Sequence, residues 1–436
     1  MIKAENKRKD LETPLPELDI FGLPLVQKSV VETLDTVHFP VSYSRTWTSS
    51  SVIEFVLNLA DDEYILLHET SIYFHAILTK RGTGVWHPAD PAEAAHVTPV
   101  NNLFHSLIDR VQLRIGSAGH VIDITDYAYK AYLSTLLGYN EAAKKTHLGA
   151  AGWSSSMEER QGRYIKAGKD ADIYLRGRLF YDFEHQCRGI IGGSKIHIKI
   201  NLKPPRFFLI AQEDKTGFGA EVAEVRLHSR VYRLAESKVK AHFKALQSVN
   251  ARYPMTTTQI KTAIIQKGST VVHADNIVTG KIPTRMFVAL VSKTAYTGTL
   301  TEDPYVFKPY KMASICCNID GAQWPNGGMN MDFEREDIVD AYYTLFQILN
   351  QHDADTVCEI SMQDFMESQC VFAFNFTQDR TSGYSVDGHC NAIKQGHMQI
   401  NMRFAQQVPY DLVMIAMCEF DTLYEIDEFH NLILKQ

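Results

Sequence analysis

The sequence of 436 residues lacks the features that define several large protein classes. Its seven cysteines are odd in number, follow no regular spacing and include no CxxC pair, so neither a disulfide framework nor structural zinc is expected. No run approaches the roughly 18 apolar residues of a membrane span, and residues 1–10 have no apolar core of the kind found in a signal peptide. The sequence therefore predicts an unsecreted protein without a membrane span, folded in the cytoplasm or nucleus.

Excess positive charge is also missing. The formal net charge is −7 and the isoelectric point is about 6.2, whereas a protein that wraps nucleic acid along its whole surface is basic. Lys3, Lys7, Arg8 and Lys9 form one small basic cluster. Four such charges suffice for weak contact with a few phosphates or for a nuclear address, and a solvated terminus is an equally good explanation.

Motifs of catalysis are absent as well. There is no GxSxG, no glycine-rich phosphate loop ending in Gly-Lys-Ser/Thr and no HExxH. The candidate metal ligands are His87, His96, His197, His389 and His397, the last two with Cys390 nearby. Structural histidines are the more common explanation for each, and chance pairing of cysteines with histidines is frequent in this composition. We predict no catalytic residue, no metal site and no cofactor.

What the sequence does contain is short strands. Residues 196–202 and 398–404 alternate apolar and polar side chains, which predicts strands with one face in a core. Residues 52–57 and 72–78 are short, rich in β-branched residues and bounded by polar residues. These patterns predict a mostly β protein.

Helical spacing occurs in few places. Residues 126–139 and 337–349 each show one apolar stripe, with Asp126 and Asp337 positioned to cap the start. We expect the two helices to seal their own sandwiches, with Tyr132 and Tyr342 at corresponding buried positions. A third, more polar helix at residues 237–247 is expected to connect the halves.

These elements occur twice in the same order, which indicates an internal structural repeat. The matched positions are Ile53 with Ile260, Phe74 with Phe287, Gly116 with Gly321, Tyr132 with Tyr342, Tyr174 with Phe372, Ile198 with Ile400, and residues 225–232 with 413–420. The size of each half suits a jelly roll. The predicted fold is all-β: a tandem (double) jelly roll of two eight-stranded β-sandwiches, each with an inserted helix. The expected parts are an N-terminal arm (1–24), jelly roll 1 (25–235), a connector (236–254) and jelly roll 2 (255–436).

Short stretches in a fixed order along nearly the whole chain resemble one known family. They are residues 18–24 with Gln27 and Ser29, residues 99–107, 129–139 with 142–145, 283–291 with 295–298, Glu419-Phe420, and residues 425–427. In these stretches the chain resembles the double jelly-roll, hexon-like major capsid proteins of Polinton/Maverick elements and adintoviruses.

The resemblance implies a structural protein of the virion and not an enzyme. It implies a homotrimer whose six jelly rolls form a pseudo-hexameric capsomer of an icosahedral shell. Expected partners are neighbouring capsomers, penton and minor capsid proteins, and for the basic arm the genome.

Two other functions fit a tandem β-sandwich. One is carbohydrate binding, for which Trp86, Trp153 and Trp324 in predicted loops would supply aromatic platforms. The other is a hydrolase with paired carboxylates on facing strands. Asn375-Phe376-Thr377 fits a glycosylation sequon, but it falls in a predicted strand of an unsecreted protein, so we expect it to be unused.

Overall fold

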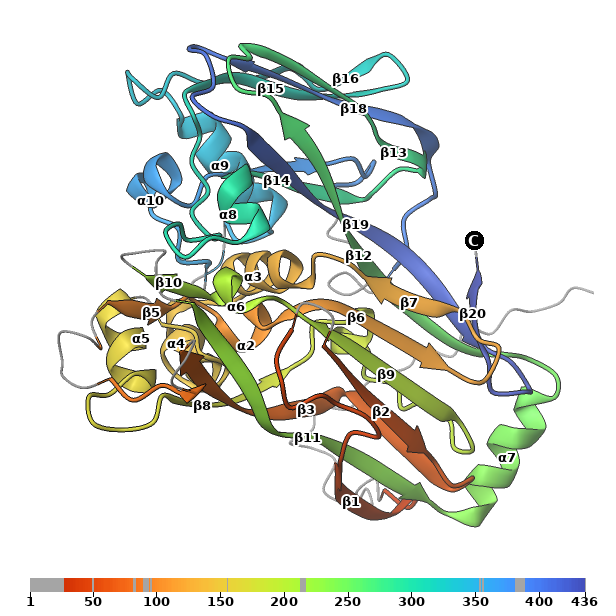
Figure 1. The fold of residues 1–436 in the computed structure, drawn as a ribbon. Coiled ribbons are helices and arrows are strands. Elements are labelled where there is room, and N and C mark those ends of the chain that lie inside the picture. The colour runs from red at the N-terminus through yellow and green to blue at the C-terminus, as the bar shows by residue number, and fades with distance from the viewer. Residues whose placement is uncertain are drawn as a thin grey trace, which may run out of the picture.

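The computed structural model describes residues 27–48, 51–80, 84–88, 94, 96–154, 156–211, 217–352, 354, 357–380 and 389–435. The predicted N-terminal arm, residues 1–24, lies outside this part of the chain. Figure 1 shows two β-sandwiches, one built from each half of the chain, with helices gathered between them and at their ends.

The first sandwich consists of two antiparallel sheets. One sheet has the order β1-β11-β3, with β8 and β4 both pairing with β3, and the other has the order β2-β9-β6-β7. The strands are β1 (Val30–His38), β2 (Val52–Asn58), β3 (Glu63–Lys80), β4 (Gly84–Val85), β6 (Ile108–Ile115), β7 (Val121–Ile124), β8 (Asp172–Arg178), β9 (Lys195–Leu202) and β11 (Phe218–Leu234). A short separate ladder joins β5 (Val97–Pro99) to β10 (Leu209–Ala211).

The second sandwich repeats this plan. One sheet has the order β12-β19-β14-β17, with β20 pairing with β19, and the other has the order β13-β18-β15-β16. The strands are β12 (Ala251–Ile265), β13 (Val271–Lys281), β14 (Arg285–Ser292), β15 (Met312–Ile319), β16 (Ala322–Asn330), β17 (Val371–Asn375), β18 (Gln395–Phe404), β19 (Leu412–Ile426) and β20 (Leu432–Lys435). β12 begins at Ala251, inside the range 236–254 expected to be the connector.

Within the described residues, eight strands of each half follow one another in the same order and occupy the same places in the two sheets. Numbered along each half, they form sheets of order 1-8-3-6 and 2-7-4-5, which is a jelly roll. The predicted tandem jelly roll is therefore confirmed. The core of each follows the alternation seen in the sequence: Ile196, Ile198 and Ile200 of β9 are buried, as are Met398 and Ile400 of β18.

One predicted correspondence is wrong. Ile53 lies in β2, the second strand of its half, whereas Ile260 lies in β12, the first strand of the other half. The true counterpart of β12 is β1, a strand of the sequence VVETLDTVH that shows no fully buried side chain. The half-buried face of β1 carries Thr36 and His38 beside Leu34, so the strand lacks the apolar alternation that predicts a strand from sequence.

Helices fill the connections. They are α2 (Leu103–Ser106), α3 (Tyr127–Gly138), α4 (Glu141–Lys145), α5 (Met157–Tyr164), α6 (Pro205–Phe208), α7 (Glu236–Leu246), α8 (Lys293–Thr297), α9 (Val339–Ile348) and α10 (Met362–Glu367), with 3₁₀ turns η1 (His147–Ala151) and η2 (Asp182–His185). None of them, within the described ranges, combines the length and apolar character that crossing a membrane requires. α7 joins the two jelly rolls, at the position expected for the connecting helix.

The two predicted repeat helices have equivalent places in the chain but different surroundings. α3 follows β7 and α9 follows β16, the fifth strand of each jelly roll. α3 is buried on nearly all sides between the sandwiches, whereas α9 packs on β17 of its own sandwich and buries fully only Ala341 and Leu345. Similar apolar stripes thus do not predict similar neighbours, and the duplication rests on the sheet order.

The expected helix caps are only partly confirmed. Asp126 occupies the N-cap position of α3, but its side chain makes no capping hydrogen bond. Ile338, not Asp337, occupies the N-cap position of α9. Tyr132 is buried, but Tyr342 is only partly buried.

Candidate functional site: the junction between the two sandwiches

The junction is built around α3. On its outer face Tyr132 stacks on Tyr305 with ring centroids 4.0 Å apart, and Tyr129 stacks on Tyr296 at 5.5 Å. Phe307 meets Tyr132 edge-on at 5.9 Å. Since Tyr296, Tyr305 and Phe307 belong to the second half of the chain, this aromatic cluster joins the two jelly rolls.

Hydrogen bonds fix the same contact. The hydroxyls of Ser106 and Tyr305 lie 2.7 Å apart, and Tyr296 donates to the Asp126 carboxylate at 2.8 Å. At the other end of α3, the Gln351 side-chain amide donates to the Leu137 carbonyl at 3.0 Å. Asp126, expected to cap its own helix, instead binds a side chain of the other jelly roll.

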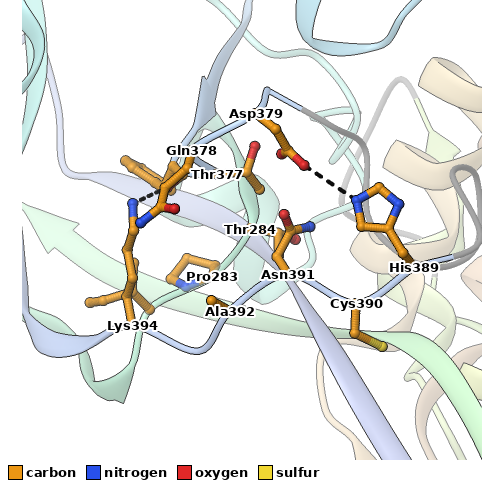
Figure 2. Close-up of a pocket in the computed structure, with 12 residues that line it drawn as sticks. Pro283, Thr284, Thr377, Gln378, Asp379, His389, Cys390, Asn391, Ala392 and Lys394 are labelled. Carbon is orange, nitrogen blue, oxygen red and sulfur yellow. Dashed lines mark hydrogen bonds and ion pairs between the residues drawn. The ribbon is translucent and has the colours of Figure 1, made fainter. Parts of the chain in front are cut away.

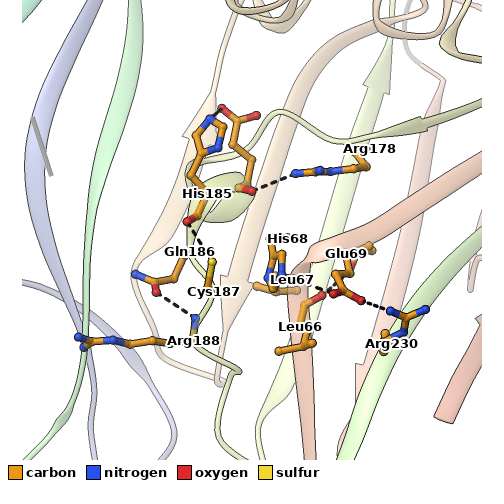
Figure 3. A network of polar contacts seen from close by, with 12 residues as sticks. Leu66, Leu67, His68, Glu69, Arg178, His185, Gln186, Cys187, Arg188 and Arg230 are labelled. Carbon is orange, nitrogen blue, oxygen red and sulfur yellow. Dashed lines mark hydrogen bonds and ion pairs between the residues drawn. The ribbon is translucent and has the colours of Figure 1, made fainter. Parts of the chain in front are cut away.

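A second set of contacts runs from η2 to β12. The buried Lys130 ammonium lies 3.1 Å from the buried Asp182 carboxylate, which also accepts from the Thr258 amide of β12 at 3.3 Å. Further along, Gln186 donates to the Pro254 carbonyl at 2.7 Å, and Arg188 donates to the Arg252 carbonyl at 2.6 Å. Figure 3 shows this segment, with His185, Gln186, Cys187 and Arg188 in succession and Arg178 of β8 beside it.

Glu184 lies within this polar segment. Its side chain is only 12% exposed and lies 3.4 Å from the His185 ring, and Arg178 donates to its carbonyl at 3.0 Å. The pKa of Glu184 is raised to about 8, chiefly by burial; the charges of Asp182 and Glu419 add to this shift, while Lys130 and Arg178 oppose it. The carboxyl is therefore largely protonated near neutral pH.

The segment before β20 forms the third contact. Asn431 accepts from the Ala118 amide at 3.0 Å, and the Leu432 carbonyl accepts from the His120 amide at 2.7 Å. Gly116 makes this approach possible: at φ +84° it turns the chain, and a Cβ there would lie 2.5 Å from the Asn431 side-chain oxygen. The C-terminal end of jelly roll 2 is thus seated on a turn of jelly roll 1.

The histidine and cysteine candidates do not assemble into a metal site. His389 pairs with Asp379 at 3.3 Å, beside a cavity of about 200 Å³ lined also by Thr284, Cys390 and Lys394 (Figure 2). His397 lies in β18, and its backbone amide donates to Asp320. Over the ranges that the structure describes, no three His, Cys, Asp or Glu side chains come together as metal ligands would.

The remaining candidates are spread over the surface. His87 pairs with Asp170 at 2.5 Å, and both side chains are about half exposed. His96 is exposed, and His197 lies on β9, where burial and the nearby Arg114 and Lys195 lower its pKa. Asn375, in the sequon, ends β17, and its side chain accepts from the Thr377 amide at 2.9 Å. Lys3, Lys7, Arg8 and Lys9 lie outside the described residues.

Two of the three tryptophans predicted as carbohydrate platforms are buried. Trp86 is 2% exposed and packs on Phe218, and Trp153 is 7% exposed and stacks on Tyr132. Trp324 is 37% exposed, with the Lys394 ammonium over its ring at 5.5 Å. Two of the three predicted platforms are core residues.

No family model matches the sequence. The chain is 25% identical over 410 residues to an uncharacterised protein of Caenorhabditis elegans, which covers 90% of this chain and 96% of the relative. Solved structures allow the fold itself to be compared. The chain is similar to the mavirus major capsid protein (10% identity, TM-score 0.54, covering 100% of this chain and 96% of the other). It is similar also to a chain of the Sputnik virophage (11%, 0.55, 97% and 92%) and to one of the PBCV-1 virus capsid (10%, 0.58, 95% and 99%).

The fold is that of double jelly-roll major capsid proteins. The similarity extends over nearly the whole of each chain, so both sandwiches and their relative arrangement take part in it. At identities near 10% this similarity establishes the fold.

Sequence reasoning missed most residues of the junction. The stripe of Tyr129, Tyr132 and Leu136 is buried, as core packing predicts, but its partners Tyr305 and Phe307 lie in an irregular segment with no sequence pattern. One signal was available: Lys130 stands alone in the apolar run of α3, where a buried cation requires a carboxylate partner.

Proposed function

We propose that this protein is a major capsid protein that assembles as homotrimers, whose six jelly rolls tile an icosahedral viral shell as pseudo-hexameric capsomers. The observation that carries the proposal is that two complete jelly rolls are held side by side by a buried junction. Such a unit presents two similar sandwiches in one fixed relation, and three copies give six similar units around one axis. The resemblance to Polinton and adintovirus capsid proteins supports a virus or element of that kind, with the virion as its location.

A sheet edge that is unpaired within the described residues supports self-association. β1 lies at the edge of its sheet, and exposed apolar side chains occur along it and the residues that follow: Val31, Val37, Phe39, Val41 and Tyr43. Phe39 and Val41 are 66% and 69% exposed. An apolar edge strand left in water invites pairing with other chains, so natural proteins cover it. We propose that this edge contacts a neighbouring copy in the trimer.

Light scattering of the purified full chain tests the proposal. A trimer has three times the chain mass of 49.4 kDa, and electron microscopy at higher concentration should show hexagonal capsomers or closed shells. Phe39→Asp should convert the trimer into monomers, whereas Met157→Asp, on exposed α5, should leave it intact. A wild-type protein that stays monomeric at all concentrations contradicts the proposed assembly.

A further inference from the structure

A groove lies beneath the connector helix α7. It encloses about 450 Å³, within the range of roughly 300–1,000 Å³ in which proteins hold ligands. Its apolar lining includes Ile191, Ala245, Leu246 and Val249, and Arg188 and Arg252 also line it. Val249, at the end of the helix, is 55% exposed.

α7 is held weakly by the contacts that the structure describes. Of its 11 residues, only Leu246 is fully buried. An isolated helix of this length is marginal in water and depends on packing of its apolar face. Ala245 and Val249 extend that face over the groove while remaining exposed. A segment lying in the groove would cover them.

The rim of the groove carries positive charge. Arg188 donates to the Arg252 carbonyl, and no carboxylate in the described residues pairs with its guanidinium. Arg252 shares Glu425 with Lys435, at 3.4 and 3.1 Å. Outside the lining of the groove, α7 carries Lys238, Lys240 and Lys244 against one acidic residue, Glu236, which pairs with Lys240. An occupant that combines apolar and acidic side chains is therefore favoured.

The chain itself contains such a segment. Residues 10–24 include Asp10, Glu12, Glu17 and Asp19 and no basic residue, and they also contain the apolar residues Leu11, Leu15, Leu18, Ile20, Phe21 and Leu23. The segment also ends in the right place: the Ala235 amide, just before α7, donates to the Ser29 carbonyl at 2.9 Å. α7, with 11 residues, is about 17 Å long, and the nine peptide steps from Leu18 to Gln27 can span about 30 Å. The segment can therefore reach the groove of its own chain.

We infer that residues 10–24 bind in the groove beneath α7 of the same chain, with their leucines on its apolar wall and their carboxylates against Arg188 and Arg252. Bound there, the segment supports the connector between the jelly rolls. The inference does not depend on the proposed capsid function, since it concerns a single copy of the chain.

Disulfide trapping in the full chain tests it. Leu18→Cys is combined with Val249→Cys after the exposed native thiols are removed by Cys187→Ser and Cys390→Ser. Mild oxidation should form a disulfide between the two introduced cysteines within one chain, which runs as a single chain on a non-reducing gel and is located by mass spectrometry. The control replaces Val249→Cys with Val271→Cys, on exposed β13 of the second jelly roll.

Charge reversal gives the second measurement. Arg188→Glu should lower the rate of disulfide formation about two- to fivefold, as expected for one exposed ion pair, and adding Glu17→Arg should restore it. Arg335→Glu, 86% exposed on the other jelly roll, should have no effect. Equal rates at position 271, no response to Arg188→Glu, or disulfides only between chains would each overturn the inference.

Discussion

The ring of Tyr132 lies parallel to that of Tyr305, at an angle of 2° and a centroid distance of 4.0 Å, although the two residues belong to different jelly rolls. Both side chains are buried, and the Tyr305 hydroxyl is hydrogen-bonded to Ser106. This pair is the centre of the contact that fixes one sandwich against the other.

Removing one ring should loosen that contact. Tyr305→Ala is expected to lower the free energy of unfolding by about 3–5 kcal/mol, because it leaves a cavity among aromatic rings. Tyr305→Phe keeps the ring and should cost only about 1 kcal/mol for the lost hydrogen bond. Guanidinium unfolding checks both, with Tyr343→Ala, at a site 52% exposed, as the control. Comparable losses for Tyr305→Ala and Tyr343→Ala would argue against a packed junction.

The buried ion pair gives a separate prediction. Lys130→Met leaves the Asp182 carboxylate buried without its cation, which should cost about 3–5 kcal/mol. The matched control is Lys293→Met, which breaks the exposed pair with Asp411 and should cost at most about 1 kcal/mol. Thermal unfolding of both variants at one pH and salt concentration makes the comparison. Equal losses in the free energy of unfolding for Lys130→Met and Lys293→Met would contradict the special role of the buried ion pair.

Gly116 lies in the turn that contacts the segment before β20, and Gly321, its counterpart in the second jelly roll, provides a matched control. Gly116 and Gly321 follow corresponding strands and have φ values of +84° and +87°. A Cβ at Gly116 would collide with Asn431, whereas nothing lies within 4 Å of one at Gly321. Both alanine variants therefore suffer backbone strain of about 1–2 kcal/mol, and Gly116→Ala alone should lose more. Hydrogen exchange of the His120 amide should rise only in Gly116→Ala.

The raised pKa of Glu184 predicts that the stability of the folded protein depends on pH. Its pKa is raised to about 8 in the folded protein from an ordinary value of 4.5, so the folded state binds the proton more tightly than the unfolded state. This contribution to stability is complete below about pH 4.5 and is lost as the pH rises through 8, with a slope approaching about 1.4 kcal/mol per pH unit. Glu184→Gln should remove this slope.

Unfolding of wild type and Glu184→Gln between pH 5 and pH 9 measures the difference. The control is Glu428→Gln, at an exposed turn. A difference between wild type and Glu184→Gln that stays constant with pH contradicts the shifted pKa.

The sequence allowed the architecture to be predicted because alternation and order are local properties. β9 and β18 could be identified from their own residues, and their places in the repeat followed. β1 could not, because its inward face is only half-buried and carries Thr36 and His38 beside Leu34. The junction could not be predicted for a different reason. Tyr305 and Gln351 contact α3 from irregular segments, and only the folded structure brings them next to it. Trp86 and Trp153 looked exposed because proline, glycine and serine surround them in the sequence.

The position of α3 has a consequence for synthesis. The ribosome releases the first jelly roll before the second, so α3 forms while Tyr296, Tyr305 and Phe307 have still to be translated. At about 5–20 residues per second, the aromatic face of α3 remains in contact with water for roughly ten to thirty seconds. During that interval each nascent chain exposes a surface that the same surface of a neighbouring nascent chain can bind. Densely loaded polysomes should therefore produce more misassembled protein than sparse ones, and chaperone demand should peak when translation has passed residue 139 and not yet reached residue 307.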